Sequence, residues 1–283
     1  MTSPRALLQA YNLRANKRFG QHFLTDPAVA EMIVQAAGIS SRDVVLEIGA
    51  GLGALTFPAA RQAARLYTVE KDVRLADFLR AKIDAEGQSN VVVLERDILR
   101  VDIEALAAEA DARLVVIGNL PYNISSQILI GLISARKAVQ RAVLMFQTEL
   151  AERLTAGPGG RDYGRLSVMI QYCADLRAVG RVAADRFFPR PKVDSAVLAI
   201  SFNTASTLSS MEEEFFFKVV RAAFGRRRKK LHNSLAGSDL GLSAEAARQA
   251  LERAGIDPSR RAETLSVSEF LELSASLQER LPT

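Results

Sequence analysis

The chain has 283 residues, 48% of them hydrophobic and 24% charged, a balance typical of a globular protein with one large domain and a smaller one. No apolar run approaches the ~18 residues of a membrane span, and the N-terminus lacks the layout of a signal peptide. One cysteine excludes an internal disulfide, and two histidines supply few metal ligands. We therefore expect a cytoplasmic monomer without a metal cofactor or membrane contact.

Short apolar runs alternate with amphipathic helical patterns, such as residues 28–37 and 73–83, over the first two-thirds of the chain. The apolar runs predict strands at residues 44–48, 66–70, 91–94, 114–117, 142–146 and 195–202. This alternation is typical of an α/β protein with a doubly wound, Rossmann-like sheet.

Small polar residues at 203–210 predict a linker. Beyond it the sequence shows only helical patterns, at residues 212–224, 227–235, 244–254 and 268–277. We therefore expect two domains, a sheet domain over residues 1–204 and a small all-helical domain over residues 205–283.

The first three predicted strands end in residues that suit a nucleotide-type ligand. Gly49 and Gly51 let the backbone turn tightly and approach a ligand. Glu70 follows about 20 residues later, the offset at which a carboxylate accepts from ribose hydroxyls. Asp97 can accept from the exocyclic amine of adenine. Alone, Glu70 could be a surface carboxylate and Asp97 a helix cap. Together they predict an adenosine-containing cofactor, either NAD or S-adenosylmethionine.

Polar and aromatic residues follow the fourth predicted strand. Asn119 offers both amide donors and a carbonyl acceptor, and Tyr122 offers a flat face. Because parallel sheets bind ligands at the carboxyl ends of their strands, these side chains are expected beside the cofactor. They suit a planar exocyclic amine and supply no proton shuttle for hydride transfer. Methyl transfer from S-adenosylmethionine is therefore favoured over an NAD-dependent oxidoreductase, which remains an alternative.

The formal net charge is +5, and its excess is concentrated in one acid-free segment. The segment contains Arg221, Arg226, Arg227, Arg228, Lys229 and Lys230. A solvated helix face is the plainer interpretation. Five adjacent cations repel one another unless something neutralises them, however, and phosphates do so best. The segment is therefore predicted to bind nucleic acid.

Six motifs in order resemble the bacterial ribosomal RNA adenine dimethyltransferase family. They are residues 16–24 (NKRFGQHFL), 47–53 (EIGAGLG), 119–126 (NLPYNISS), 162–167 (DYGRLS), 187–195 (FFPRPKVDS) and 227–235 (RRKKLHNSL). The resemblance runs almost from end to end. It implies that S-adenosylmethionine is used to dimethylate two adjacent adenines near the 3′ end of small-subunit ribosomal RNA, during assembly of that subunit.

The resemblance also implies roles for particular residues. The cofactor would contact His22, Leu24, Gly49, Gly51, Glu70, Asp97, Ile98 and Asn119. The catalytic group would be Asn119, Leu120, Pro121, Tyr122 and Phe187. Two positions depart from the family's pattern. His22 stands where members often carry Asn, which leaves its side-chain role open, and Gln127 replaces an expected Pro.

A mechanism follows from the chemistry of the adenine amine, whose lone pair is delocalised into the ring. If the Asn119 side-chain carbonyl and the Leu120 backbone carbonyl accept its two N–H groups, the nitrogen can pyramidalise and attack the methyl group. Pro121 would fix the turn, Tyr122 would stack on the flipped base, and Phe187 would cover the other face. Core packing is the alternative role for Phe187.

Two further alternatives stay open on the same scaffold. One is a resistance methyltransferase that modifies large-subunit RNA, against which the long basic helical tail argues. The other is a non-catalytic assembly or transcription factor, against which the complete Asn119–Tyr122 tetrad argues.

Overall fold

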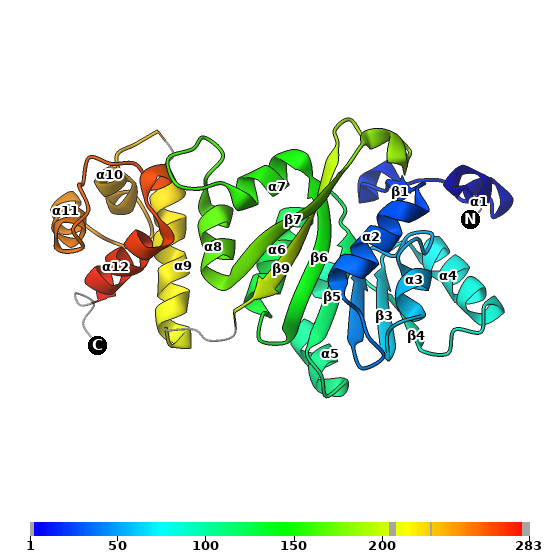
Figure 1. The fold of residues 1–283 in the computed structure, drawn as a ribbon. Helices are drawn as coiled ribbons and strands as arrows, with labels where there is room; N and C mark the ends of the chain where they lie inside the picture. Colours follow the sequence, from blue (N-terminus) through cyan, green and yellow to red (C-terminus); the bar gives the residue numbers. More distant parts are fainter. Residues whose placement is uncertain (1–2, 204–207, 227, 279–283) are drawn as a thin grey trace. The chain divides into compact units, whose positions relative to one another are not determined.

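The computed structural model describes residues 3–203, 208–226 and 228–278. The chain forms two compact units, one of Met1–Ala151 with Asp175–Thr204 and the other of Glu152–Ala174 with Ala205–Thr283 (Figure 1). Each is described by itself below.

The first unit contains a seven-stranded sheet in the order β4-β3-β2-β5-β6-β9-β7. Its strands are β2 (Val44–Ile48), β3 (Arg65–Glu70), β4 (Val91–Glu95), β5 (Leu114–Asn119), β6 (Val139–Gln147), β7 (Ala174–Val182) and β9 (Ser195–Phe202). The five strands from β4 to β6 are parallel, and β9 runs antiparallel to β6. All six predicted strands are confirmed, and so is the Rossmann-like α/β class.

Strand β7 was not predicted from the sequence. Only its two ends, Ala174 and Val182, are buried, while the residues between them are exposed or half-buried. The charged residues Asp175, Arg177 and Arg181 interrupt β7, so it lacks the apolar run by which the other strands are recognised.

Helices connect the strands of the first unit. They are α1 (Pro4–Ala10), α2 (Pro27–Ala37), α3 (Thr56–Ala60), α4 (Val73–Ala85), α5 (Ile103–Glu109) and α6 (Ser125–Ser134), with 3₁₀ turns η1 (Lys17–Phe19), η2 (Ile98–Arg100) and η3 (Ala184–Arg186). Helix α7 (Thr148–Thr155) contains the boundary between the two units, at Ala151. The side chains of Asp26, Asp72 and Asp102 cap α2, α4 and α5 by accepting from backbone N–H groups of the first turn. Helices α2 and α3 pack on the sheet in one apolar core.

A small second sheet joins distant parts of the first unit. Strand β1 (Phe23–Leu24) pairs antiparallel with β8 (Phe187–Phe188), in the register Phe23 to Phe188 and Leu24 to Phe187. The pairing brings the N-terminal segment next to the loop that precedes β9. Both segments carry motifs found in the sequence.

The second unit is helical. It contains α8 (Arg165–Cys173), α9 (Ser210–Phe224), α10 (Leu231–Ala236), α11 (Ala244–Arg253), the 3₁₀ turn η4 (Ala262–Thr264) and α12 (Val267–Gln278). Residues 152–174, which the sequence placed with the sheet, belong here because Tyr163 and Val168 lie in the same core as Phe216 and Phe270. The predicted helix over 227–235 begins only at Leu231.

Two findings limit the kinds of site the fold can hold. Across residues 3–203, 208–226 and 228–278, no helix combines the length and apolar character needed to cross a membrane. The same residues contain no group of three His, Cys, Asp or Glu side chains arranged to hold a metal ion.

Candidate active site

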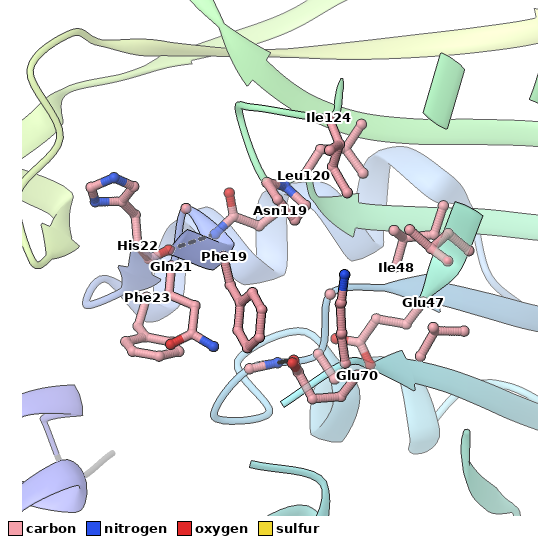
Figure 2. A pocket seen from close by; sticks show the side chains of 18 of the residues that line it. Phe19, Gln21, His22, Phe23, Glu47, Ile48, Glu70, Asn119, Leu120 and Ile124 are labelled. Carbon is pink, nitrogen blue, oxygen red and sulfur yellow. Dashed lines mark hydrogen bonds between the residues drawn. The ribbon is translucent and has the colours of Figure 1, made fainter. Parts of the chain in front are cut away.

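A pocket of about 220 Å³ lies at the carboxyl ends of β2, β3 and β5, beside η1 and β1 (Figure 2). The predicted site residues that line it are His22, Leu24, Gly49, Gly51, Glu70, Asp97, Ile98, Asn119, Leu120, Pro121 and Tyr122. Residues from three of the six motifs therefore meet in one place, together with Glu70, Asp97 and Ile98 from the ends of two further strands. The edge of the sheet on which they meet is the one where open α/β sheets bind ligands.

The turn after β2 forms the floor of the pocket and requires glycine. Gly49 and Gly51 have φ angles of 77° and 57°, a left-handed region that other residues rarely adopt. A Cβ atom on Gly51 would also lie 3.1 Å from the ring of Phe23. The backbone N–H of Gly51 donates to Oε2 of Glu70 over 2.8 Å, which ties the turn to the end of β3.

Glu70 lies nearly buried at the end of β3, with 7% of its surface exposed. Its Oε1 accepts from the backbone N–H of Asp72 over 2.9 Å, and its Oε2 accepts from Gly51. Burial raises the pKa of this carboxyl above its usual value despite these bonds. Each carboxylate oxygen can accept a second hydrogen bond. Glu70 is thus oriented to receive a vicinal pair of hydroxyls, as in a ribose.

Asp97 follows β4 and already has two protein partners. Its Oδ1 caps η2 by accepting from the Leu99 N–H, and its Oδ2 lies 2.7 Å from Nζ of Lys71. The Lys71 bond lowers the pKa of the Asp97 carboxyl. The Lys71 ammonium also lies 5.5 Å from the centre of the Phe19 ring. The sequence offered no signal for Lys71 or Phe19, because both act through residues distant in the chain.

Glu47 is a buried acid that the sequence analysis did not assign to the site. It is 1% exposed, and Oε2 accepts from the hydroxyls of Thr56 and Thr68, each over 2.7 Å. Burial raises its pKa to about 7. The sequence contained a signal for Glu47, because a charged residue inside the apolar run of β2 is unusual. Glu47 lines the pocket close to Gly49.

The pocket is lined by charges of both signs: the acids Glu47, Glu70 and Asp97, and the bases Arg18, Lys71 and Arg96, of which Lys71 is paired with Asp97. A positive charge nearby would favour the ionised form of Glu47 and of Glu70, whose pKa values burial raises. S-adenosylmethionine carries a sulfonium, an ammonium, a carboxylate, a ribose and an adenine. The residues present therefore fit this cofactor in charge and in hydrogen bonding.

Asn119 ends β5 and faces the N-terminal segment. Its Nδ2 donates to the backbone carbonyl of His22 over 2.8 Å, the dashed line in Figure 2. This bond commits the amide nitrogen to the protein and presents the amide oxygen as the group that meets an incoming N–H. The backbone N–H of Leu120 donates to the Met145 carbonyl over 3.3 Å, which holds the next residue against β6.

Tyr122 is held at both its edge and its face. Its hydroxyl lies 2.6 Å from Oγ of Ser195 at the start of β9. Burial raises the pKa of this hydroxyl, and the bond to Ser195 opposes that shift. Its ring is stacked on the His22 imidazole, with ring centres 5.5 Å apart and planes 23° apart. The sequence gave no indication of the roles of Ser195 and the imidazole.

The aromatic pair of β8 is Phe187 and Phe188, of which Phe187 was predicted to cover one face of the target base. Phe187 is 3% exposed and lies in the core with Leu24 and the residues of α2, so its burial does not support stacking on a target base. Phe188 is half-buried and packs beside Phe23. Successive residues of a strand face opposite sides, which explains why only one of the pair is fully buried. The Leu24 side chain also lies in that core, and Leu24 lines the pocket.

The basic segment lies in the helical unit, on the connection between α9 and α10. Arg226, Arg228, Lys229 and Lys230 are exposed, whereas Arg227 lies outside the described residues. Arg221, on α9, forms an ion pair of 2.7 Å with Asp239. The cations therefore project from a connection and not from a continuous helix as predicted.

The sequence and the fold both match known proteins. Residues 12–279 match the family described as "Ribosomal RNA adenine dimethylase". The chain belongs to this family. The resemblance found in the sequence motifs is thereby confirmed, and so is the enzyme class, an S-adenosylmethionine-dependent methyltransferase.

Relatives of this adenine dimethylase are similar over nearly their whole length. The "Ribosomal RNA small subunit methyltransferase A" of Desulforapulum autotrophicum is 51% identical, covering 98% of this chain and 97% of the relative. The protein of the same name from Syntrophotalea carbinolica is 46% identical, over 94% of this chain and 98% of its own.

Two solved structures share the fold. A dimethyladenosine transferase from Plasmodium falciparum superposes with a TM-score of 0.77 at 28% identity, covering 91% of this chain and 98% of its own. The 23S rRNA methyltransferase ErmE gives a TM-score of 0.69 at 26% identity, covering 90% of this chain and 99% of its own. The fold is therefore shared by a dimethyladenosine transferase and by a 23S rRNA methyltransferase.

Proposed function

We propose that this adenine dimethylase methylates the N6 amines of two adjacent adenines near the 3′ end of small-subunit ribosomal RNA, during assembly of that subunit. The observation that carries this proposal is the placement of Asn119 and Tyr122 at the rim of a pocket that fits S-adenosylmethionine. The choice of subunit is supported by the identity of 51% to a small-subunit enzyme, against 26% to a large-subunit enzyme.

The pocket would hold the cofactor through groups that are already fixed. Glu70 accepts from the ribose hydroxyls, the turn at Gly49 and Gly51 lies along the methionine part, and Asp97 with Ile98 borders the adenine. When bound, S-adenosylmethionine supplies an electrophilic methyl group on a positively charged sulfur. Glu47 and Glu70 provide negative charge beside it.

Asn119 and Leu120 would activate the target amine. The Asn119 amide oxygen and the Leu120 backbone carbonyl each accept one N–H of the adenine amine, which draws the nitrogen toward a pyramidal geometry and localises its lone pair. Pro121 lacks an N–H and restricts the turn that places the Leu120 carbonyl. The methylated amine is acidic enough to release its proton to water. After the first methylation one N–H remains, and one carbonyl suffices to hold it for the second.

Tyr122 would bind the face of the flipped adenine. Base stacking on an aromatic ring contributes about 1–3 kcal/mol. Phe188, being half-buried, is better placed than Phe187 to contribute a second aromatic surface. In the helical unit, the exposed Arg226, Lys229 and Lys230 would bind phosphates of the RNA, which position the substrate without reading its sequence.

Tritiated methyl transfer to three substrates tests the proposal: unmethylated small subunits, large subunits and bulk RNA, each followed by nucleoside analysis. Dimethyladenosine confined to small-subunit RNA is the expected result. Label in large-subunit RNA would instead place the enzyme with the resistance methyltransferases. Absence of transfer by protein that still binds S-adenosylmethionine would favour an assembly factor.

A further inference from the structure

His22 makes three contacts through three different groups. Its backbone carbonyl accepts from Nδ2 of Asn119 over 2.8 Å (Figure 2). Its Nδ1 lies 2.6 Å from the carbonyl oxygen of Pro189, in the loop after β8. Its ring stacks on the ring of Tyr122. The first contact belongs to the backbone and survives any substitution of the side chain, whereas the other two belong to the imidazole.

The contact with Pro189 fixes the orientation of the imidazole. A backbone carbonyl can only accept a hydrogen bond, so Nδ1 must carry the hydrogen. With Nδ1 directed at Pro189, rotation of the ring about its bond to Cβ would break the bond. The plane of the His22 ring is therefore determined by the loop between β8 and β9.

The stacking contact passes this orientation on to Tyr122. The planes of the two rings differ by 23°, and the imidazole lies against one face of the phenol ring. The edge of Tyr122 is held separately, by the hydroxyl of Ser195. Two contacts of different chemistry thus fix both the position and the tilt of the ring.

We infer that the His22 side chain is a positioning residue for the target adenine. It supports Tyr122 from behind and links the tilt of that ring to the 189–195 loop, so that a flipped base meets a surface of fixed orientation. The inference rests on the proposed function, in which Tyr122 stacks on the adenine. It assigns the imidazole to the RNA side of the site and only the backbone of His22 to the cofactor side.

Two substitutions separate the two contacts of the imidazole. His22→Asn keeps a donor, because Nδ2 of Asn occupies nearly the place of Nδ1, but removes the ring. His22→Phe keeps a flat ring against Tyr122 but removes the donor. His22→Ala removes both. His232 provides the matched control, since its Nδ1 makes the same kind of contact, 2.7 Å from the Pro258 carbonyl, in the helical unit.

The experiment measures base stacking directly and apart from catalysis. 2-Aminopurine replaces the target adenine in the small-subunit RNA, and its fluorescence is recorded with saturating protein. The chain has no tryptophan, so the signal has no indole background. Dissociation constants for S-adenosylmethionine, thermal midpoints and the kcat and KM of methyl transfer to unmodified RNA are measured for the same variants.

His22→Ala is expected to weaken the quenching of 2-aminopurine and to lower kcat/KM for RNA by about two- to tenfold, the range of one aromatic pair. His22→Phe should recover most of the quenching, and His22→Asn should recover less. Affinity for S-adenosylmethionine should stay within about twofold, since the backbone carbonyl that holds Asn119 is retained. His232→Asn should quench like the wild type.

The inference would be overturned if all three His22 variants quenched 2-aminopurine fluorescence as strongly as the wild type does. It would also be overturned if folded His22→Phe lost as much quenching and activity as His22→Ala. A loss of cofactor affinity that parallels the loss of activity would also overturn it, because the imidazole would then act on the cofactor side. If the wild type itself transfers no methyl group to small-subunit RNA, the proposed function fails instead, and the two failures are thereby distinguished.

Discussion

Asn119 uses the two ends of one amide for different tasks. Its Nδ2 is bound to the His22 carbonyl, and its oxygen is the group that we propose accepts from the substrate amine. Asn119→Ala should therefore lower kcat by about two to three orders of magnitude, the usual cost of removing a group that acts on the transition state. Binding of S-adenosylmethionine, measured by calorimetry, should change little. Unchanged turnover would remove Asn119 from the mechanism.

Substitutions of Tyr122 test whether its ring or its hydroxyl contributes more to methyl transfer. Tyr122→Phe loses only the bond to Ser195 and should lower kcat/KM by less than about tenfold. Tyr122→Ala also loses the stacking surface and should cost roughly five- to 150-fold. Steady-state kinetics with small subunits measures both. The reverse order would show that the hydroxyl, and not the ring, does the chemistry.

Glu47 makes stability depend on pH. Its pKa in the folded protein is about 7, against 4.5 in the unfolded chain, so the native state binds the extra proton between these values. Stability should therefore fall as pH rises through this window, by roughly 3 kcal/mol for this group. In Glu47→Gln, whose amide oxygen can still accept from Thr56 and Thr68, that part of the dependence should vanish.

Urea denaturation of the wild type and of Glu47→Gln at about pH 5 and about pH 8 measures the difference. At the higher pH the free energy of unfolding should be larger for the variant than for the wild type. At the lower pH this difference should become smaller, because the wild type is stabilised. Curves that stay parallel across the window would show that Glu47 is not the titrating group.

At the level of elements, the close packing of β5 against β2 depends on Gly118. A Cβ atom there would lie 2.8 Å from the backbone carbonyl oxygen of Ile48, which cannot rotate away. Gly118→Ala should therefore separate the strand ends, destabilise the protein by about 1–3 kcal/mol and weaken cofactor binding, because the Gly49 turn of the pocket directly follows Ile48. Chemical denaturation and calorimetry measure the two effects.

Gly131 provides the matched control on the following helix, α6. No atom lies within 4 Å of a Cβ placed there, so Gly131→Ala fills open space inside a helix. Because alanine favours the helix, this variant should be more stable by roughly 0.5–1 kcal/mol with unchanged cofactor binding. Equal effects of the two alanines would contradict the role given to β5.

The sequence predicted those elements and site residues whose signal is local. Strands β2 to β6 are short apolar runs, and the residues at their ends, Gly49 and Glu70 among them, follow from the rule that parallel strands end on one edge. What it missed depends on contacts between distant segments. Lys71 meets Asp97, and Ser195 meets Tyr122, only after folding.

Burial also decided cases that the sequence had left open. Phe187 and Phe188 are chemically identical neighbours, and only their register in a two-residue strand against Phe23 and Leu24 separates the core ring from the half-buried one. The start of α10 at Leu231 was missed for a similar reason. Arginine and lysine are good helix formers, so nothing local marks the connection before it.

At the scale of the whole molecule, we propose that the basic connection of the helical unit binds phosphates of the RNA. Replacing Arg228, Lys229 and Lys230 by Gln should weaken RNA binding and reduce the slope of log K against log salt by about 2, since each lost phosphate contact removes about 0.7–0.9. Binding isotherms at several salt concentrations measure the slope. Lys218→Gln, on α9, is the control, because Lys218 is already paired with Glu214 at 2.9 Å. An unaltered slope in the triple variant would return the segment to a solvated surface.

A ribosome makes β6 and β7 before β9, although β9 lies between them in the finished sheet. Until residues 195–202 have left the exit tunnel, one edge of β6 therefore offers its backbone N–H and C=O groups to neighbouring nascent chains. The insertion of β9 closes that edge and in the same event delivers Ser195 to the hydroxyl of Tyr122. The sheet and the base-binding surface are thus completed in the same step of synthesis and folding. A chain released before residue 195 lacks both.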